Sequence, residues 1–326
     1  MPIPLICRTL TTFAADGSLD EQAFGAHLNR LVSHGHGVYL ASGGSGESHA
    51  MTVEEIKRVY EIGVECCKGR VPIFANPPEQ HTADAAYEHA VLAVSAGVEM
   101  VNLYGPSNLH GYVPTDDEYI AYHREFLNRF TGPVALAPNP IIGYTPRPSL
   151  VAEICNEYPQ VQAINLALQT ETYMADIFDA LRRWVDFYVP LVGSQNMLAM
   201  GATGMLGAEA NIVPRTYRRY ATLCEAGTSA ELGATYRDLR RLTRYLSDWG
   251  QSPRWLKMAT RVLGLPGGNG GPRRPYLLPP QAELDEFAEG LSHLDLDEID
   301  EMMVDRGGDM APPEIHNEKN RIQGGA

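Results

Sequence analysis

The chain has 326 residues, of which 44% are hydrophobic and 20% charged, as expected for a globular protein with a large core. Its formal net charge of −14 argues against a nucleic-acid partner, because phosphate binding needs clustered lysine and arginine. No stretch approaches the ~20 apolar residues that span a bilayer, and the N-terminus lacks the features of a signal peptide, so we expect a cytoplasmic protein without a membrane partner.

The five cysteines, Cys7, Cys66, Cys67, Cys155 and Cys224, are odd in number and irregularly spaced. No pair has the C-x-x-C spacing of a zinc or redox site. The sequence therefore indicates free thiols in a reducing compartment, and we expect neither a metal nor a cofactor.

Eight short apolar segments alternate with longer amphipathic ones. This alternation predicts a parallel sheet, and eight units within about 225 residues fit a closed (β/α)8 TIM barrel better than an open doubly wound sheet. The fold class is therefore α/β. The expected strands are residues 5–12, 37–42, 71–75, 98–104, 134–138, 161–168, 186–192 and 204–208.

Helices are expected between these strands. Thr52, followed by Glu54 and Glu55, has the composition of a helix N-terminus. The expected helices are residues 19–34, 53–67, 82–96, 116–130, 148–157 and 171–184, a short segment at 196–202, and a long stretch at 214–249 that breaks near Gly227.

The barrel is expected to occupy residues 1–250. Residues 251–304 are expected to form a C-terminal helical region, with helices at about 252–262, 280–291 and 295–304. Residues 305–326 are polar and contain glycine and proline, which predicts a flexible tail.

In such a barrel the active site lies at the carboxyl ends of the strands. The second predicted strand is followed by a turn whose glycines let backbone N–H groups approach a ligand, which suits a carboxylate or phosphate. Gly44, Ser45, Gly46 and Glu47 are the candidate binding residues there. A tight turn without a ligand is an equal alternative.

The ends of three other strands carry further candidates. Tyr104, His110 and Tyr112 could donate or accept protons, although a purely structural hydrogen bond is an equal alternative for each. Candidate substrate-binding residues are Asn139, after the fifth strand, and Ser194 and Gln195, after the seventh. These three could equally cap a turn or a helix.

Several blocks of the sequence resemble the dihydrodipicolinate synthase/N-acetylneuraminate lyase family, in the family order and spacing. They are Thr11-Thr12-Phe13, residues 43–48 followed by 51–55, residues 69–72 and residues 201–214. The resemblance covers roughly residues 5–300. It implies a (β/α)8 barrel with a C-terminal helical domain, commonly a homotetramer, that cleaves, condenses or dehydrates 2-oxo acids.

The resemblance fails where the family's chemistry lies. Asn165, near the end of the sixth predicted strand, takes the place of the lysine that forms an imine with the keto carbon. Ala137 stands where the family has a tyrosine that relays protons. Gly44 replaces the first hydroxyl residue of the turn, whereas Ser45 keeps the second. The sequence thus resembles a divergent member that lacks the Schiff-base lysine.

Other residues could restore parts of the missing chemistry. Tyr104 and Tyr112 are candidates for the tyrosine that family members often donate to a neighbouring subunit. None of the chain's four lysines lies in a predicted strand: they are Lys57, Lys68, Lys257 and Lys319. Imine formation by Lys257, reaching into the barrel from the C-terminal region, remains an alternative.

Two functions follow. The first is a lyase-like enzyme for aldol cleavage or condensation, dehydration or cyclisation of a small carboxylated carbonyl compound such as a 2-oxo acid. Asn165 would polarise the carbonyl by hydrogen bonding, and Tyr104, His110 or Tyr112 would move protons. The second is a non-catalytic ligand-binding or regulatory protein that kept the barrel. For either we expect a small-molecule ligand and a homo-oligomer, a dimer or tetramer.

Overall fold

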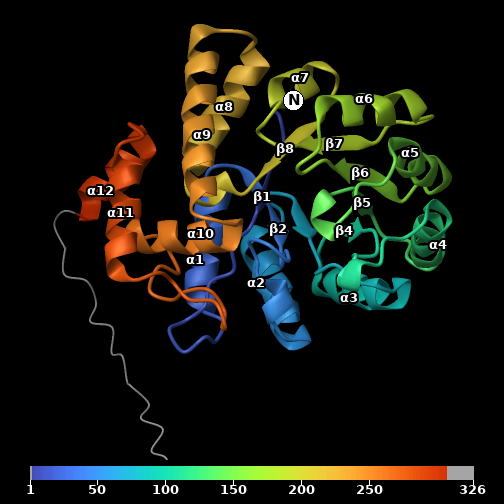
Figure 1. Cartoon of the computed structure of the whole chain (residues 1–326), viewed down its shortest axis with the longest axis horizontal. Coiled ribbons are helices and arrows are strands. Elements are labelled where there is room, and N and C mark those ends of the chain that lie inside the picture. The colour runs from blue at the N-terminus through green and yellow to red at the C-terminus, as the bar shows by residue number, and fades with distance from the viewer. Residues whose placement is uncertain (1, 307–326) are drawn as a thin grey trace, which may run out of the picture.

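The computed structural model describes residues 2–306 and shows a closed barrel of eight parallel strands in sequential order (Figure 1). All eight predicted strands are confirmed. They are β1 (Leu5–Arg8), β2 (His36–Leu40), β3 (Ile73–Ala75), β4 (Met100–Tyr104), β5 (Val134–Ala137), β6 (Val161–Asn165), β7 (Asp186–Val189) and β8 (Gly204–Gly207).

A ring of helices covers the barrel. The helices are α1 (Glu21–Ser33), α2 (Val53–Cys67), α3 (Ala83–Ala96), α4 (Asp116–Leu127), α5 (Pro148–Glu157), α6 (Glu171–Ala180), α7 (Ser194–Ala199) and α8 (Pro214–Ala226). Short 3-10 turns follow four of the strands: η1 (Ser48–Ala50), η2 (Leu109–Gly111), η3 (Pro140–Ile142) and η4 (Glu209–Asn211).

Local sequence signals account for several of these boundaries. Thr52 caps α2 as expected, and the structure adds a reciprocal bond from Glu55, with hydrogen bonds of 2.9 and 3.2 Å between the two residues. The predicted break near Gly227 separates α8 from α9, and Gly227 has a φ of +95°. Some predicted strands were too long: β6 ends at Asn165, and Leu168 beyond it has a left-handed backbone with φ 62°.

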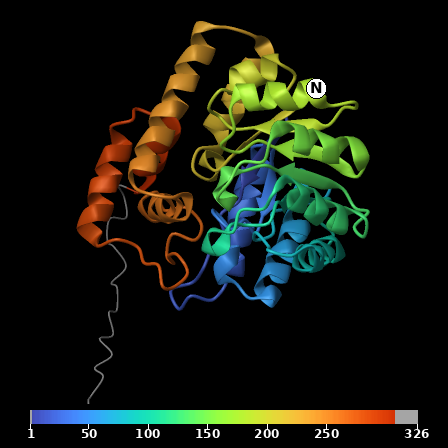
Figure 2. The ribbon, with the colours of Figure 1, turned by 45° about the vertical axis from the view of Figure 1, so that its right-hand side comes forward.

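The C-terminal helices are α9 (Ala230–Asp248), α10 (Ser252–Val262), α11 (Gln281–Ser292) and α12 (Asp297–Arg306). Helix α10 packs against α9 and α11, and the four C-terminal helices gather on one side of the barrel (Figures 1 and 2). Helix α12 contacts the barrel helices, since Glu298 accepts from the Thr216 N–H of α8 at 2.7 Å and lies 3.9 Å from Arg30 of α1. The expected tail falls almost entirely outside the described residues, and the expected domain boundary near residue 250 stays a prediction. No helix within residues 2–306 is long and apolar enough to cross a membrane.

Candidate active site at the strand ends

The lumen of the barrel is apolar at its centre and polar toward the carboxyl ends of the strands. Because side chains alternate along a strand, Arg8 lies on the same face as Ile6, and Asn102 and Tyr104 lie on the same face as Met100. Polar residues from several strands therefore meet above the apolar layer, where barrel enzymes place their chemistry. The apolar layer comprises Ile6, Tyr39, Phe74, Met100, Ala135, Ala163, Ala167, Tyr188 and Leu206.

Asn76, Asn102 and Asn165 form a buried hydrogen-bonded group, here called the asparagine cluster. Asn102 is its centre, since its Nδ2 donates to Asn76 Oδ1 at 2.9 Å. Its Oδ1 accepts from the Tyr39 hydroxyl at 2.9 Å and from Asn165 Nδ2 at 3.4 Å. Buried amides are stable only when they are paired, so these bonds hold the three side chains in one arrangement.

Asn165 is the last residue of β6, and its side chain is buried in the lumen. Its Oδ1 accepts a hydrogen bond from the Ala167 N–H at 3.1 Å, and its Nδ2 donates to Asn102. A primary amide carries two N–H donors, and beside its bond to Asn102 the Asn165 amide also interacts with the Tyr39 hydroxyl. An amide N–H can donate to a carbonyl oxygen, but an amide nitrogen cannot attack the carbonyl carbon.

Tyr104 ends β4 and points into the barrel of its own chain. It pairs in register with Ala137 of β5 and packs against Ala137 and Ile142. The Tyr104 phenol of β4 thus lies beside Ala137, the β5 residue that has no aromatic ring. Burial raises the pKa of Tyr104 well above its usual range, so the phenol is a neutral hydrogen-bond donor. Contact of Tyr104 or Tyr112 with a neighbouring subunit stays a prediction.

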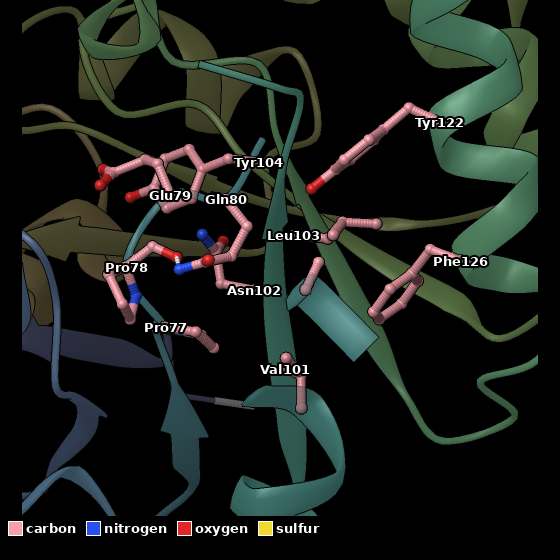
Figure 3. Close-up of a pocket in the computed structure, with 11 residues that line it drawn as sticks. Pro77, Pro78, Glu79, Gln80, Val101, Asn102, Leu103, Tyr104, Tyr122 and Phe126 are labelled. Atoms are coloured by element: carbon pink, nitrogen blue, oxygen red, sulfur yellow. Dashed lines mark hydrogen bonds between the residues drawn. The ribbon is translucent and has the colours of Figure 1, made fainter. Parts of the chain in front are cut away.

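Glu79, in the loop between β3 and α3, lies beside Tyr104 in Figure 3. Asn102 and Tyr104 point to this side of β4, whereas Leu103 points to the other, toward α4 (Figure 3). Glu79 also contacts the turn after β2, since a Cβ at Gly43 would lie 2.8 Å from Glu79 Oε2. Burial raises the pKa of the Glu79 carboxyl, which makes it a better proton acceptor than an exposed glutamate.

The turn after β2 uses many of its own hydrogen-bonding groups. The Gly46 N–H donates to Ser42 Oγ at 2.9 Å, and the Glu47 N–H donates to the Gly44 carbonyl at 3.1 Å. The Ser45 hydroxyl donates to Ser252 Oγ of α10 at 3.3 Å. The backbone N–H groups of Gly44 and Ser45 would be left to bind a ligand at this turn. These are fewer donors than the sequence led us to expect, and a binding role for the turn stays a prediction.

The Glu47 side chain holds Lys257 of α10. Lys257 Nζ lies 3.2 Å from Glu47 Oε1, donates to the Thr11 carbonyl at 2.5 Å, and sits 4.6 Å from the centre of the Phe13 ring. Burial lowers the pKa of Lys257, while the charge of Glu47 acts in the opposite direction. Glu47 Oε2 also accepts from the Arg273 N–H at 2.8 Å. These contacts make Glu47 a partner of the C-terminal region.

Three further predicted residues lie on the loops around the mouth. His110 and Tyr112 are exposed, and the Tyr112 hydroxyl donates to Glu118 Oε1 at 2.9 Å. Asn139 is buried, and its Oδ1 accepts from the Ile141 N–H at 3.1 Å, which caps η3. None of these contacts places the three side chains in the asparagine cluster, and their roles toward a ligand stay predictions.

Ser194 and Gln195 begin α7. The Ser194 hydroxyl is fully buried, donates to the Leu191 carbonyl at 2.8 Å, and lies 2.7 Å from the Tyr220 hydroxyl of α8. Gln195 is exposed. Ser194 therefore joins α7 to α8, and binding of substrate by either residue stays a prediction.

Four residues of this site were not selected from the sequence: Arg8, Asn76, Glu79 and Asn102. A signal for two of them was present, because Arg8 lies within an otherwise apolar strand and Asn102 lies two residues before Tyr104. To select these residues one must know where each strand ends and which of its side chains point inward. The alternation of side chains along a strand does not tell the inward face from the outward one until the strand register is known.

The fold and the site together define a (β/α)8-barrel protein that presents amide and phenol donors at its strand ends. Residues 3–294 match the model of the dihydrodipicolinate synthetase family, and the chain belongs to this family. A 4-hydroxy-tetrahydrodipicolinate synthase of Methanothrix thermoacetophila is 29% identical over 264 residues, 79% of this chain and 86% of that protein. A protein of Rhizobium meliloti, described as an uncharacterized DapA-like lyase, is 26% identical over 296 residues, 87% of this chain and 93% of that protein.

Solved structures share the fold. The dihydrodipicolinate synthase from Aquifex aeolicus has a TM-score of 0.80 and 19% identity, covering 90% of this chain and 98% of that one. The enzyme from Acinetobacter baumannii, complexed with pyruvate, has a TM-score of 0.79 and 18% identity, covering 90% of this chain and 99% of that one. At these identities the likeness establishes the fold alone.

Proposed function

We propose that the protein is a lyase-like enzyme that acts on a small carboxylated carbonyl compound, such as a 2-oxo acid, without a lysine imine. The observation that carries the proposal is Asn165 at the end of β6, buried and hydrogen-bonded to Asn102, which lines one cavity with Tyr104 and Glu79. Membership of a family whose relatives are named as synthases and lyases supports the reaction class.

In the proposed reaction an N–H of Asn165 and the hydroxyl of Tyr104 donate to the carbonyl oxygen of the substrate. Glu79 removes a proton from the neighbouring carbon, and the carbonyl oxygen becomes an enolate oxygen that the two donors stabilise. The carbanion then adds to an aldehyde carbon, and protonated Glu79 returns its proton to the new alkoxide. The same steps in reverse cleave an aldol.

The described lysines do not favour an imine. Lys57 and Lys68 are exposed on or just after α2, and Lys319 lies outside the described residues. Lys257 forms an ion pair with Glu47 and a hydrogen bond to the Thr11 carbonyl. Converting it to an imine would separate it from a buried carboxylate, which costs about 3–5 kcal/mol when a buried pair is broken.

Two measurements test the proposal. The first follows exchange of the pyruvate methyl protons in D₂O by NMR, which reports enolate formation without knowledge of the second substrate. We expect the protein to accelerate exchange and Asn165→Ala to slow it by roughly 100-fold or more. Asn29→Ala, a matched change at an exposed position of α1, should leave the rate unchanged.

The second measurement incubates the protein with pyruvate and borohydride and determines its mass by mass spectrometry. We expect no added mass, and a stable adduct at any lysine would overturn the imine-free mechanism. Parallel runs with 2-oxobutyrate and 2-oxoglutarate extend both assays to larger 2-oxo acids. Binding of these acids without exchange would instead support the non-catalytic alternative.

We also propose that the chain forms a homo-oligomer. Apolar side chains are exposed on the loops around the barrel mouth, with Leu109 62%, Tyr112 67% and Ile141 60% exposed. Such a patch is typical of a subunit contact. Light scattering coupled to gel filtration should show a dimer or tetramer, and a monomer at micromolar concentration would contradict the proposal.

A further inference from the structure

Arg8 is a half-buried arginine on the inward face of the barrel. It is the last residue of β1 and pairs in register with Tyr39 of β2, which belongs to the inner apolar layer. Its Nε is buried and has no hydrogen-bond partner. Across the whole described part of the chain, the Arg8 side chain makes no hydrogen bond or ion pair.

Several other partly buried arginines within residues 2–306 are paired, although Arg240 of α9 is not. Arg273 forms an ion pair with Glu55, and Arg30 donates to the Asn211 carbonyl at 2.9 Å. Arg8 is half-buried, and a buried N–H donor without a partner is costly. The chain contains 40 aspartates and glutamates, yet within residues 2–306 none lies within ion-pair distance of Arg8. The absence of a partner in so acidic a chain suggests that the partner is a ligand.

The charge of Arg8 acts on the site from the opposite side of the lumen. It lowers the pKa of Tyr104, the β4 residue next to the asparagine cluster, against the larger effect of burial. The wall between these groups carries small side chains, since the inward residues of β5 and β6 include Ala135, Ala137 and Ala163. A small molecule placed there would meet Arg8 at one end and Asn165 at the other.

We infer that Arg8 binds the carboxylate of the ligand inside the barrel and directs the neighbouring carbonyl toward Asn165 and Tyr104. A guanidinium offers two parallel N–H donors that match the two oxygens of a carboxylate. Arg8 is thereby the residue that selects anionic over neutral carbonyl compounds. The role given to the carbonyl rests on the proposed function, whereas carboxylate binding does not require turnover.

Calorimetric binding of pyruvate and of its neutral analogue pyruvamide tests this assignment. Arg8→Gln should weaken pyruvate binding roughly 10- to 100-fold. The pyruvate affinity of Arg8→Lys should lie between those of the wild type and Arg8→Gln. Binding of pyruvamide should be weak in the wild type and unchanged in Arg8→Gln. The matched control is Arg237→Gln, at an exposed position of α9, which should bind both compounds as the wild type does.

The stability of the variant separates binding from a structural role. Because Arg8 has no partner to lose, Arg8→Gln should unfold at a temperature equal to or above that of the wild type. A large drop in melting temperature would assign Arg8 to the framework of the barrel and overturn the inference. Equal pyruvate binding by the wild type and Arg8→Gln would overturn it too, as would a wild type that binds no pyruvate.

The proposed function and this inference can fail separately. Pyruvate binding that depends on Arg8, without methyl exchange, would sustain the inference and refute the enzymatic proposal. Methyl exchange that depends on Asn165 but is unaffected by Arg8→Gln would sustain the enzymatic proposal and refute the inference.

Discussion

Lys257 of α10 and Glu47 of the turn after β2 form an ion pair of 3.2 Å in which the two side chains are 2% and 1% exposed. The pair joins the C-terminal helices to the mouth of the barrel. Glu47 has a left-handed backbone with φ 56°, and its carboxylate also accepts from the Arg273 N–H. The family turn therefore serves here to anchor the helices that pack beside it.

Lys257→Met should destabilise the protein by about 3–5 kcal/mol, because it leaves the Glu47 carboxylate buried without its partner. The double variant Lys257→Met/Glu47→Gln should recover part of this loss. Urea denaturation measures both. Lys57→Met removes an exposed pair with Glu61 and should cost less than about 1 kcal/mol. Equal costs for Lys257→Met and Lys57→Met would refute the structural role of the buried pair.

Asn102→Leu should destabilise the protein by about 2–4 kcal/mol, because the Tyr39 hydroxyl and Asn76 Oδ1 would each lose a buried partner. The cost should be smaller when Tyr39→Phe is already present, since the hydroxyl is then gone. A double-mutant cycle on the free energy of unfolding measures this coupling. Additive losses would show that the two side chains do not depend on one another.

Glu79→Gln should lower the rate of pyruvate methyl exchange by roughly 100-fold or more, as expected for loss of a general base. Because burial raises the pKa of Glu79, exchange by the wild type should fall as the pH drops through that raised value. The exchange rate of Glu79→Gln should not show this fall at low pH. Glu88→Gln on the exposed face of α3 is the matched control. A wild-type profile in Glu79→Gln would assign the base to another residue.

The protein should lose stability as the pH falls from 6.5 to 4. Burial lowers the pKa of His123 from 6.5 to about 4, so in this range the unfolded chain binds a proton that the folded chain does not. His27 and His36 behave alike, and burial lowers the pKa of each to about 4. Each histidine contributes a slope of up to about 1.4 kcal/mol per pH unit.

His123→Phe should make this decline less steep, because one of the buried groups no longer titrates. The replacement ring can keep the contact with Tyr119, whose ring centre lies 4.2 Å from that of His123. Denaturation at several pH values measures the slope. An unchanged slope would show that His123 does not contribute to acid unfolding.

The barrel was predictable because its signals are local. Alternation of short apolar segments with capped helices located all eight strands, and Thr52 and Gly227 marked helix boundaries that the structure confirms. Strand ends were harder to predict. The apolar run that contains β6 continues to Leu168, but the strand ends at Asn165 because the chain then turns out of the sheet.

The candidate site was predictable only in part. Asn165 and Tyr104 were selected from the sequence and lie in the lumen, whereas Ser194 and Asn139 bond to nearby helices and turns. A hydroxyl or amide after a strand has the same local sequence whether it faces the lumen or caps a helix. Only the direction of the side chain separates the two cases.

The sequence by itself determined that Asn165, and no lysine, stands in the sixth strand, because the identity of a side chain is a local property. The tertiary structure alone decided what surrounds it. Closure of the barrel brings Asn102 and Asn165, 63 residues apart, into contact and places Arg8 across the lumen, where its buried Nε has no partner among residues 2–306. It also buries Lys257 against Glu47. Hydrogen bonding and charge pairing depend on distances that barrel closure sets.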